Sequence, residues 1–293
     1  EITTRLVGSE MCIRDRYIAI TQNIVNIIAS LSFVYLLNMK VEGVALGTLI
    51  AQYAGFLMAL LLWMRHYKPL RKRIAIKGIW QKQAMSRFFS VNRDIFFRTL
   101  CLVIVTMFFT SAGAAQGETV LAVNTLLMQL FTLFSYIMDG FAYAGEALAG
   151  KYIGACNRTA LHQTVRQLFG WGIGLSLCFT LLYAIGGRSF LGLLTNEVDV
   201  INEAENYFYW VLAIPLAGFS AFLWDGIFIG ATATRQMLVS MFIASTCFFA
   251  TYYSFYSLMG NHALWMAFLI YLFLRGIIQA FLSRKILNIF PTT

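Results

Sequence analysis

Residues 120–157 read VLAVNTLLMQLFTLFSYIMDGFAYAGEALAGKYIGACN, a long uncharged run followed by two acidic residues, Asp139 and Glu146. A transmembrane helix needs about 20 predominantly apolar residues, and residues 119–144 provide such a stretch. The sequence here therefore predicts a membrane-spanning helix that carries carboxylates toward one end.

The composition of the whole chain indicates an integral membrane protein. Of its 293 residues, 59% are hydrophobic and only 12% are charged, and the mean hydropathy of +0.71 is outside the range of a soluble domain with a polar surface. The apolar runs do not alternate with polar residues as the strands of a transmembrane β-barrel do. We predict an all-α membrane protein with eight transmembrane helices, at residues 17–37, 43–64, 95–113, 119–144, 168–186, 207–229, 238–258 and 264–283.

The positions of lysine and arginine predict the orientation, because cytoplasmic loops of membrane proteins carry an excess of both. If residues 65–93 are cytoplasmic, all of the 22 basic residues except Lys40 and Arg188 fall on that side. The net charge of +9 then reflects topology and contact with the lipid bilayer. Residues 65–93 contain no base-reading motif, so we expect no nucleic-acid partner.

The cysteines and histidines indicate neither a disulfide framework nor a metal site. They are dispersed along the chain, show no CxxC or HExxH spacing, and give no cluster of ligands within the predicted helices. They are Cys12, Cys101, Cys156, Cys178, Cys247, His66, His162 and His262.

The first sixteen residues, EITTRLVGSEMCIRDR, differ in character from the rest of the chain. They contain no apolar core long enough for a signal peptide, and the string LVGSEMCIRDR resembles a recurrent artefact of sequence assembly. We therefore exclude residues 1–16 from the fold and expect the natural N-terminus to be missing.

An internal echo links two of the predicted helices. The sequence MDGFAYAGEALAG at 138–150 resembles WDGIFIGATATRQM at 224–237. Each copy closes an apolar helix and places an aspartate, Asp139 or Asp225, roughly 30 Å from the outer end of that helix. Both aspartates are thus expected near the cytoplasmic edge of the hydrocarbon. Matched polar positions of this kind are typical of repeat-built transporters.

Four separated blocks of the chain resemble the DinF branch of the multidrug and toxic compound extrusion (MATE) transporters. Family members have twelve helices in two six-helix lobes. The resemblance implies that residues 17–64 are the last two helices of the N-terminal lobe, 65–93 a basic cytoplasmic linker and 94–293 the C-terminal lobe. The blocks are NRDIFFRTL (92–100), LAVNTLLMQLFTLFSYIMDGFAYAGEALAGKYIGACN (121–157), LWDGIFIGATATRQM (223–237) and NHALWMAFLIYLFLRG (261–276).

The resemblance also implies a function. It suggests an antiporter of the bacterial inner membrane that exports drugs or other toxic amphipathic or cationic compounds by alternating access, driven by protons or sodium. The family's coupling aspartate belongs to the first helix, which this chain does not contain. Some members pair an asparagine with an acidic residue four positions on and a threonine on the next helix. The matching residues are Asn26, Ser30 and Thr48, so a hydroxyl replaces the carboxylate at that expected cation site. We expect a monomer with no cofactor other than the coupling ion.

Five charged residues within the predicted membrane zone require an explanation, because an ionised side chain at the bilayer centre costs roughly 2.5–3.5 kcal/mol. Asp139 and Glu146 are two helical turns apart on one face, and Asp225 is expected at the depth of Asp139. Arg98 is expected near the inner end of its helix, and Arg275 about 17 Å into its own. We predict a polar cluster on the cytoplasmic side. It is either a permanent set of ion pairs or a gate whose pairs break and reform, with a carboxylate carrying the proton.

Three further residues are candidates for a role in transport. Asn124 and Gln129 lie in the outer half of their helix, where they either line the substrate cavity or form hydrogen bonds between helices. Pro215 removes a backbone hydrogen bond and is expected to bend its helix. The bend is either a moving part or a static kink that improves packing.

Other functions fit less well. A lipid-linked saccharide or lipid translocator of the same wider superfamily would carry more cationic residues in its cavity. The predicted helices here carry three acidic residues and two arginines. A membrane-embedded enzyme is disfavoured because no His, Cys or Ser constellation occurs. A purely structural membrane protein has no need of five buried charges.

Overall fold

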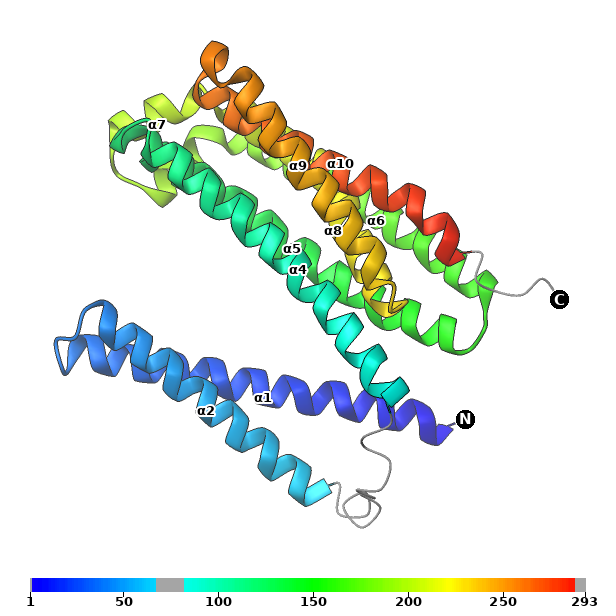
Figure 1. Ribbon diagram of the computed structural model, residues 1–293. Coiled ribbons are helices and arrows are strands. Elements are labelled where there is room, and N and C mark those ends of the chain that lie inside the picture. Colours follow the sequence, from blue (N-terminus) through cyan, green and yellow to red (C-terminus); the bar gives the residue numbers. More distant parts are fainter. Residues whose placement is uncertain (1, 67–81, 288–293) are drawn as a thin grey trace. The chain divides into compact units, whose positions relative to one another are not determined.

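The computed structural model describes residues 2–66 and 82–287, which are helical except for short connections (Figure 1). Eight of the described helices are long and apolar enough to cross a membrane, which agrees with the number predicted from sequence, and α7 is a short helix of eight residues. The helices are α1 (Ile2–Tyr35), α2 (Val41–His66), α4 (Lys82–Ala114), α5 (Glu118–Gly154), α6 (Arg158–Leu194), α7 (Val198–Glu205), α8 (Phe208–Gly230), α9 (Thr234–Met259) and α10 (Asn261–Leu287).

The chain divides into two units, Glu1–Gln81 and Lys82–Thr293. Residues 82–93 of the expected linker at 65–93 form the first three turns of α4, and the assignment of the linker and lobes stays a prediction. Residues 67–81 of that linker lie outside the described part. At the other end, α1 begins at Ile2, so the helix runs through the stretch that the sequence led us to exclude.

The first unit contains a helical hairpin. Helices α1 and α2 pack against each other and are joined by a short turn in which Asn38 has a φ of 51°. Asparagine tolerates this left-handed conformation better than most residues. The turn reverses the chain so that the two helices lie antiparallel.

The second unit is a bundle in which α8 lies at the centre. Helix α8 packs against α5, α6 and α10, and 56% of its most apolar window is buried, the highest share among the candidate spans. Helices α5 and α6 each contain 37 residues, a length of about 55 Å. They extend well beyond the hydrocarbon thickness of about 30 Å, and this explains why the apolar runs underestimate their lengths.

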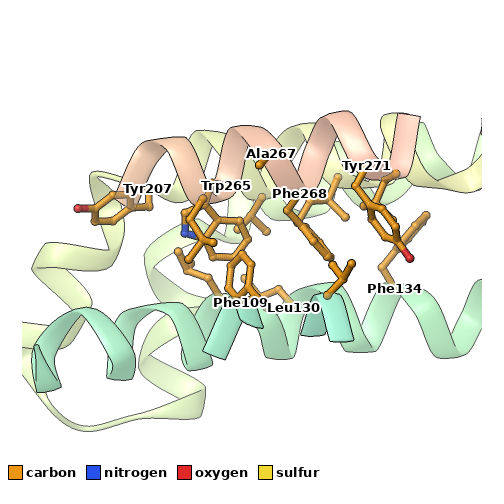
Figure 2. Packing of buried hydrophobic residues seen from close by; sticks show 14 of the residues in the cluster. Phe109, Leu130, Phe134, Tyr207, Trp265, Ala267, Phe268 and Tyr271 are labelled. Atoms are coloured by element: carbon orange, nitrogen blue, oxygen red, sulfur yellow. The ribbon is translucent and has the colours of Figure 1, made fainter. Parts of the chain in front are cut away.

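Aromatic side chains fill the core of the bundle (Figure 2). Trp265 and Phe268 of α10 each contact the ring of Phe109 on α4, and Phe134 of α5 packs edge-on against Phe179 of α6. These rings are almost entirely buried, and together they fix α10 between its neighbours. The polar residues of α10 are thereby held in the interior.

Glycines let α5 and α8 approach closely. A Cβ placed on Gly226 would lie 2.0 Å from the carbonyl oxygen of Ala142, and one on Gly230 would lie 2.3 Å from that of Glu146. Gly226 and Gly230 form a GxxxG spacing, which favours such contacts between membrane helices. The echo that contains Asp139 and Asp225 thus lies on two helices in direct backbone contact.

Candidate functional site

A cavity of about 420 Å³ lies within the second unit, between α4, α5, α8 and α10. All five charged residues of the predicted cluster line it, namely Arg98, Asp139, Glu146, Asp225 and Arg275. Aromatic rings form much of the remaining wall, from Phe131, Tyr143, Phe222, Phe268 and Tyr271. Its size and its apolar walls with a few polar groups are those of a small-molecule site.

Asp225 is the centre of the polar cluster. One of its carboxylate oxygens accepts hydrogen bonds from both Arg98 and Arg275, and the other accepts from Nε2 of Gln279 at 2.6 Å. Asp225 is 6% exposed and Arg275 is 4% exposed. A buried ion pair is stable only where further hydrogen bonds satisfy the charged groups. The three donors from α4 and α10 satisfy the carboxylate, whereas Nε of Arg98 and Nε of Arg275 are buried without a hydrogen-bond partner among the described residues.

Helix α10 presents its polar residues to the cluster at a spacing of four. Tyr271, Arg275 and Gln279 follow one another at successive turns, so they lie on one helix face. The guanidinium of Arg275 also lies over the ring of Phe222, 5.9 Å from its centroid. Gln279 and Tyr271 were missed from the sequence, although their spacing from Arg275 is a signal that would have found them.

Asp139 and Glu146 differ from Asp225 in having no direct partner. Both are partly exposed and line the cavity, yet neither forms a hydrogen bond or ion pair within residues 82–287. The arginines and Asp225 still act on Asp139 electrostatically. The structure therefore brings Asp225, Arg98 and Arg275 into contact and leaves two carboxylates open to the cavity.

The positions of the cluster residues along their helices differ. Arg98 stands at the midpoint of α4, which spans Lys82–Ala114, and its expected place near the inner end of the membrane-spanning part stays a prediction. The helix continues through the charged residues 82–94, which the apolar pattern had excluded. Arg275 is likewise near the middle of α10, and Asp225 is five residues from the end of α8.

The three residues of the expected cation site on the first unit are close together. Nδ2 of Asn26 donates to Oγ1 of Thr48 at 3.2 Å, and Ser30 Oγ donates to Oδ1 of Asn26 at 3.5 Å. The first bond connects α1 with α2, and the second lies within α1. Thr48 also donates to the carbonyl of Val44, so within the hairpin these groups satisfy one another.

Asn124 joins helices and does not line the polar cavity. Its Nδ2 donates to Oδ1 of Asn261 and its Oδ1 accepts from Nδ2 of Asn261, both at 2.9 Å. Trp265 Nε1 donates to the same Oδ1 at 2.9 Å, and Asn124 is 2% exposed. Gln129 is exposed and is also absent from the cavity lining. Of the two alternatives for Asn124, the structure favours the helix-to-helix hydrogen bond.

Pro215 is buried inside α8, which continues on both sides of it. Proline has no N–H and disturbs the hydrogen bonds of the preceding turn. The hydroxyl of Thr180 on α6 donates to the carbonyl of Leu212 in that turn at 3.2 Å. The carbonyl that loses its partner is that of Val211, four residues before Pro215, so the bond from Thr180 links α6 to this turn without replacing the one that proline removes.

Comparison with known proteins identifies the family of the chain. The family model described as MatE matches residues 95–253. The chain belongs to the MatE family. The matched part of this MatE chain contains Arg98, Asp139, Glu146 and Asp225, while Arg275 and Gln279 lie beyond its end.

Curated relatives include bacterial and plant proteins. DNA damage-inducible protein F of Escherichia coli (strain K12) is 34% identical over 288 residues, which cover 96% of this MatE chain and 61% of the relative. Protein DETOXIFICATION 42 of Arabidopsis thaliana is 23% identical, with 87% of this chain and 48% of the relative covered. The chain therefore spans about three fifths or less of the length of these relatives.

Solved structures share the fold. A MATE transporter in the bent conformation has a TM-score of 0.76 at 17% identity, with 94% of this chain and 62% of that chain covered. The Vibrio cholerae MATE transporter VcmN in the bent form has a TM-score of 0.76 at 15% identity, with 93% and 62% covered. The expected all-α membrane architecture is thus confirmed, and the protein is a multi-pass protein of the bacterial inner membrane.

Proposed function

We propose that this MatE chain forms part of an antiporter that exports toxic amphipathic compounds by alternating access, driven by a proton or sodium gradient. The observation that carries the proposal is the cavity of about 420 Å³. It combines aromatic walls with two carboxylates that have no partner in residues 82–287. Aromatic faces and carboxylates are the groups that bind organic cations.

Asp139 and Glu146 bind the exchanged cations in this proposal. Asp225 is held by two arginines and a glutamine, so it is not available to a cation in the described state. Asp139 and Glu146 are about 10 Å apart along α5 and open to the same cavity. A coupling ion and a substrate cation therefore compete for neighbouring carboxylates, and this competition is a simple basis for exchange.

The ion pairs of Asp225 act as the gate. Arg98 and Arg275 lie on α4 and α10, and Asp225 on α8, so the three side chains join helices that surround the cavity. Breaking a pair and transferring an arginine to Asp139 would loosen this connection and change the charge that the substrate meets. No cofactor other than the coupling ion takes part.

The remaining expectations are parts of the same proposal. Residues 17–64 supply the last two helices of an N-terminal lobe, with Asn26, Ser30 and Thr48 as a second polar site, and residues from α4 onward form the C-terminal lobe. The transporter acts as a monomer in the lipid bilayer. Pro215 is the position where α8 bends.

The alternative of a lipid-linked saccharide or lipid translocator is less well supported. The phosphate groups of such substrates require cationic partners, whereas the cavity carries three acids and two arginines. Both arginines are already engaged by Asp225.

Resistance in a host without its own pumps tests the proposal. The complete transporter would be expressed there, and growth measured on dyes, biocides, bile salts and oxidants. Asp139→Asn is expected to abolish resistance, while Asp199→Asn, an exposed residue on α7, keeps it. Unchanged resistance in both Asp139→Asn and Asp225→Asn, at normal protein levels, would refute the mechanism. Loss of resistance on sodium depletion, but not with a proton uncoupler, would identify sodium as the coupling ion.

A further inference from the structure

A second cavity, of about 500 Å³, lies between α4 and α9 on a face of α4 different from the one that borders the polar cavity. We call it the α4–α9 groove. Every side chain that lines it is apolar. The lining residues are Phe97, Leu100, Cys101, Ile104, Leu238, Val239, Phe242 and Ile243.

The groove opens to the surface of the second unit within the membrane-spanning segments. Phe242 is 63% exposed, and Phe97, Ile104 and Val239 are each more than two fifths exposed. The candidate spans Phe88–Ala114 and Thr234–Met259 contain all of its residues. A hydrocarbon-lined groove at this depth is suited to an acyl chain.

Two arginines lie at one end of the groove. Helices α4 and α9 run in the same direction (Figure 1), so their N-terminal ends lie on one side. Arg93 precedes Phe97 by four residues and Arg235 precedes Val239 by four, which places each arginine one turn before the groove on the same helix face. Both side chains are exposed. Arg235 is the second residue of α9, whereas Arg93 lies three turns into α4. A long arginine side chain can extend along the protein surface toward the headgroup layer.

The charge at this end is suited to a single phosphate. Nε and Nη2 of Arg93 donate to Oδ1 of the buried Asp94, at 3.4 and 3.2 Å. This ion pair uses Nε and Nη2, and Nη1 of Arg93 forms no hydrogen bond within residues 82–287. Arg235 forms no hydrogen bond or ion pair within residues 82–287. The three side chains together carry one net positive charge.

We propose that the α4–α9 groove binds an anionic phospholipid, with its phosphate between Arg93 and Arg235 and an acyl chain along the groove. The distance from Arg93 to Ile104 along α4 is about 16 Å, which accommodates most of an acyl chain. The site is separate from the polar cavity, and it recognises its ligand by a phosphate at one end and a hydrocarbon chain along its length. Basic side chains at the membrane surface recognise anionic lipids in the same way.

Native mass spectrometry of the complete transporter tests this proposal. The protein would be purified in detergent, freed of lipid, and titrated with phosphatidylglycerol or with phosphatidylcholine of the same acyl chains. We expect the wild type to retain phosphatidylglycerol preferentially. The double variant Arg93→Gln, Arg235→Gln is expected to lose at least roughly fivefold of that preference, the effect of about one arginine at a membrane surface. Val239→Trp, which fills the groove, is expected to weaken binding of both lipids.

Arg166→Gln is the matched control, because Arg166 is exposed on α6 and does not line the groove; it should bind lipid as the wild type does. Circular dichroism and a monodisperse elution profile would show that each variant is folded. An unchanged preference in the double variant would overturn the proposal, as would wild-type binding by Val239→Trp. Displacement of the lipid by millimolar inorganic phosphate would indicate a site for free anions, and a dimer that Val239→Trp dissociates would indicate an interface between copies. Either result would also overturn it.

Discussion

Arg275 on α10 forms a buried ion pair with Asp225 on α8. The two side chains are 5% and 8% exposed, near the middle of one membrane helix and close to the end of another. Each charge alone would be costly in the membrane. Arg98, Arg275 and Gln279 all donate hydrogen bonds to the carboxylate of Asp225.

Asp225→Asn is expected to destabilise the protein strongly. The substitution leaves two arginines in the interior without their anion, and breaking a buried pair costs about 3–5 kcal/mol. The free energy of unfolding, measured by denaturant titration in detergent, should fall by that amount. Asp199→Asn, on the exposed face of α7, should change it little. Equal stability of the two variants would show that the pairs of Asp225 are not structural.

The two arginines should contribute unequally. The Arg275 side chain is 5% exposed and the Arg98 side chain 18% exposed, so Arg98 is better hydrated and its removal leaves a less isolated carboxylate. Arg275→Gln is therefore expected to lower the apparent melting temperature more than Arg98→Gln. The reverse order would mean that burial does not determine the strength of these pairs.

The close approach of α5 and α8 predicts that alanine substitutions at two glycines change the stability in opposite directions. Gly226→Ala would place a Cβ 2.0 Å from the carbonyl oxygen of Ala142, so the helices must separate, at a cost of about 1–3 kcal/mol. Gly140→Ala meets nothing within 4 Å and should stabilise α5 by roughly 0.5–1 kcal/mol through helix propensity. Thermal unfolding of the two variants would give shifts of opposite sign. A tolerated Gly226→Ala would contradict the packing described here.

The hydrogen-bonded pair of Asn124 and Asn261, near the N-terminal ends of α5 and α10, predicts a fourth effect on stability. Asn124→Ala leaves the amide of Asn261 and Nε1 of Trp265 without the partner they have here, and a buried unsatisfied group costs about 1–3 kcal/mol. Gln129→Ala, five residues away and exposed, is the control and should be nearly neutral. Similar unfolding midpoints for the two variants would argue against the amide pair.

Much of the fold was predictable because membrane helices follow a simple rule of length and hydropathy. The eight spans were each found from an apolar run. Their ends were not, because charged turns continue the helix beyond the hydrocarbon, as α4 shows by beginning at Lys82. Arg98 therefore lies at the midpoint of α4, although it is close to the start of the apolar run.

The charged residues of the site could be predicted from the sequence, because burying a charge is costly. The neutral residues of the site could not be predicted in this way. Arg98, Arg275 and Asp225 were grouped because an isolated charge in a membrane needs a partner. Gln279 was missed because a neutral amide has no such cost of burial, and only its spacing of four residues from Arg275 indicates that it shares that helix face. From the sequence, Gly226 and Gly230 of α8 were noticed only as part of the internal echo. Their contact with α5 was not predicted, because the sequence of one helix does not indicate which helix its glycines contact.

In the proposed mechanism Asp139, which is open to the cavity and has no partner in the described unit, binds the substrate cation, whereas Asp225 is occupied by arginine. The most direct measurement is equilibrium binding of the fluorescent cation ethidium to the purified complete transporter, with Asp199→Asn as control. Loss of a charged contact costs about 1.4 kcal/mol or more, which is tenfold in affinity. We predict that Asp139→Asn weakens ethidium binding at least about tenfold while remaining folded. Wild-type affinity in that variant would show that Asp139 does not bind the cation.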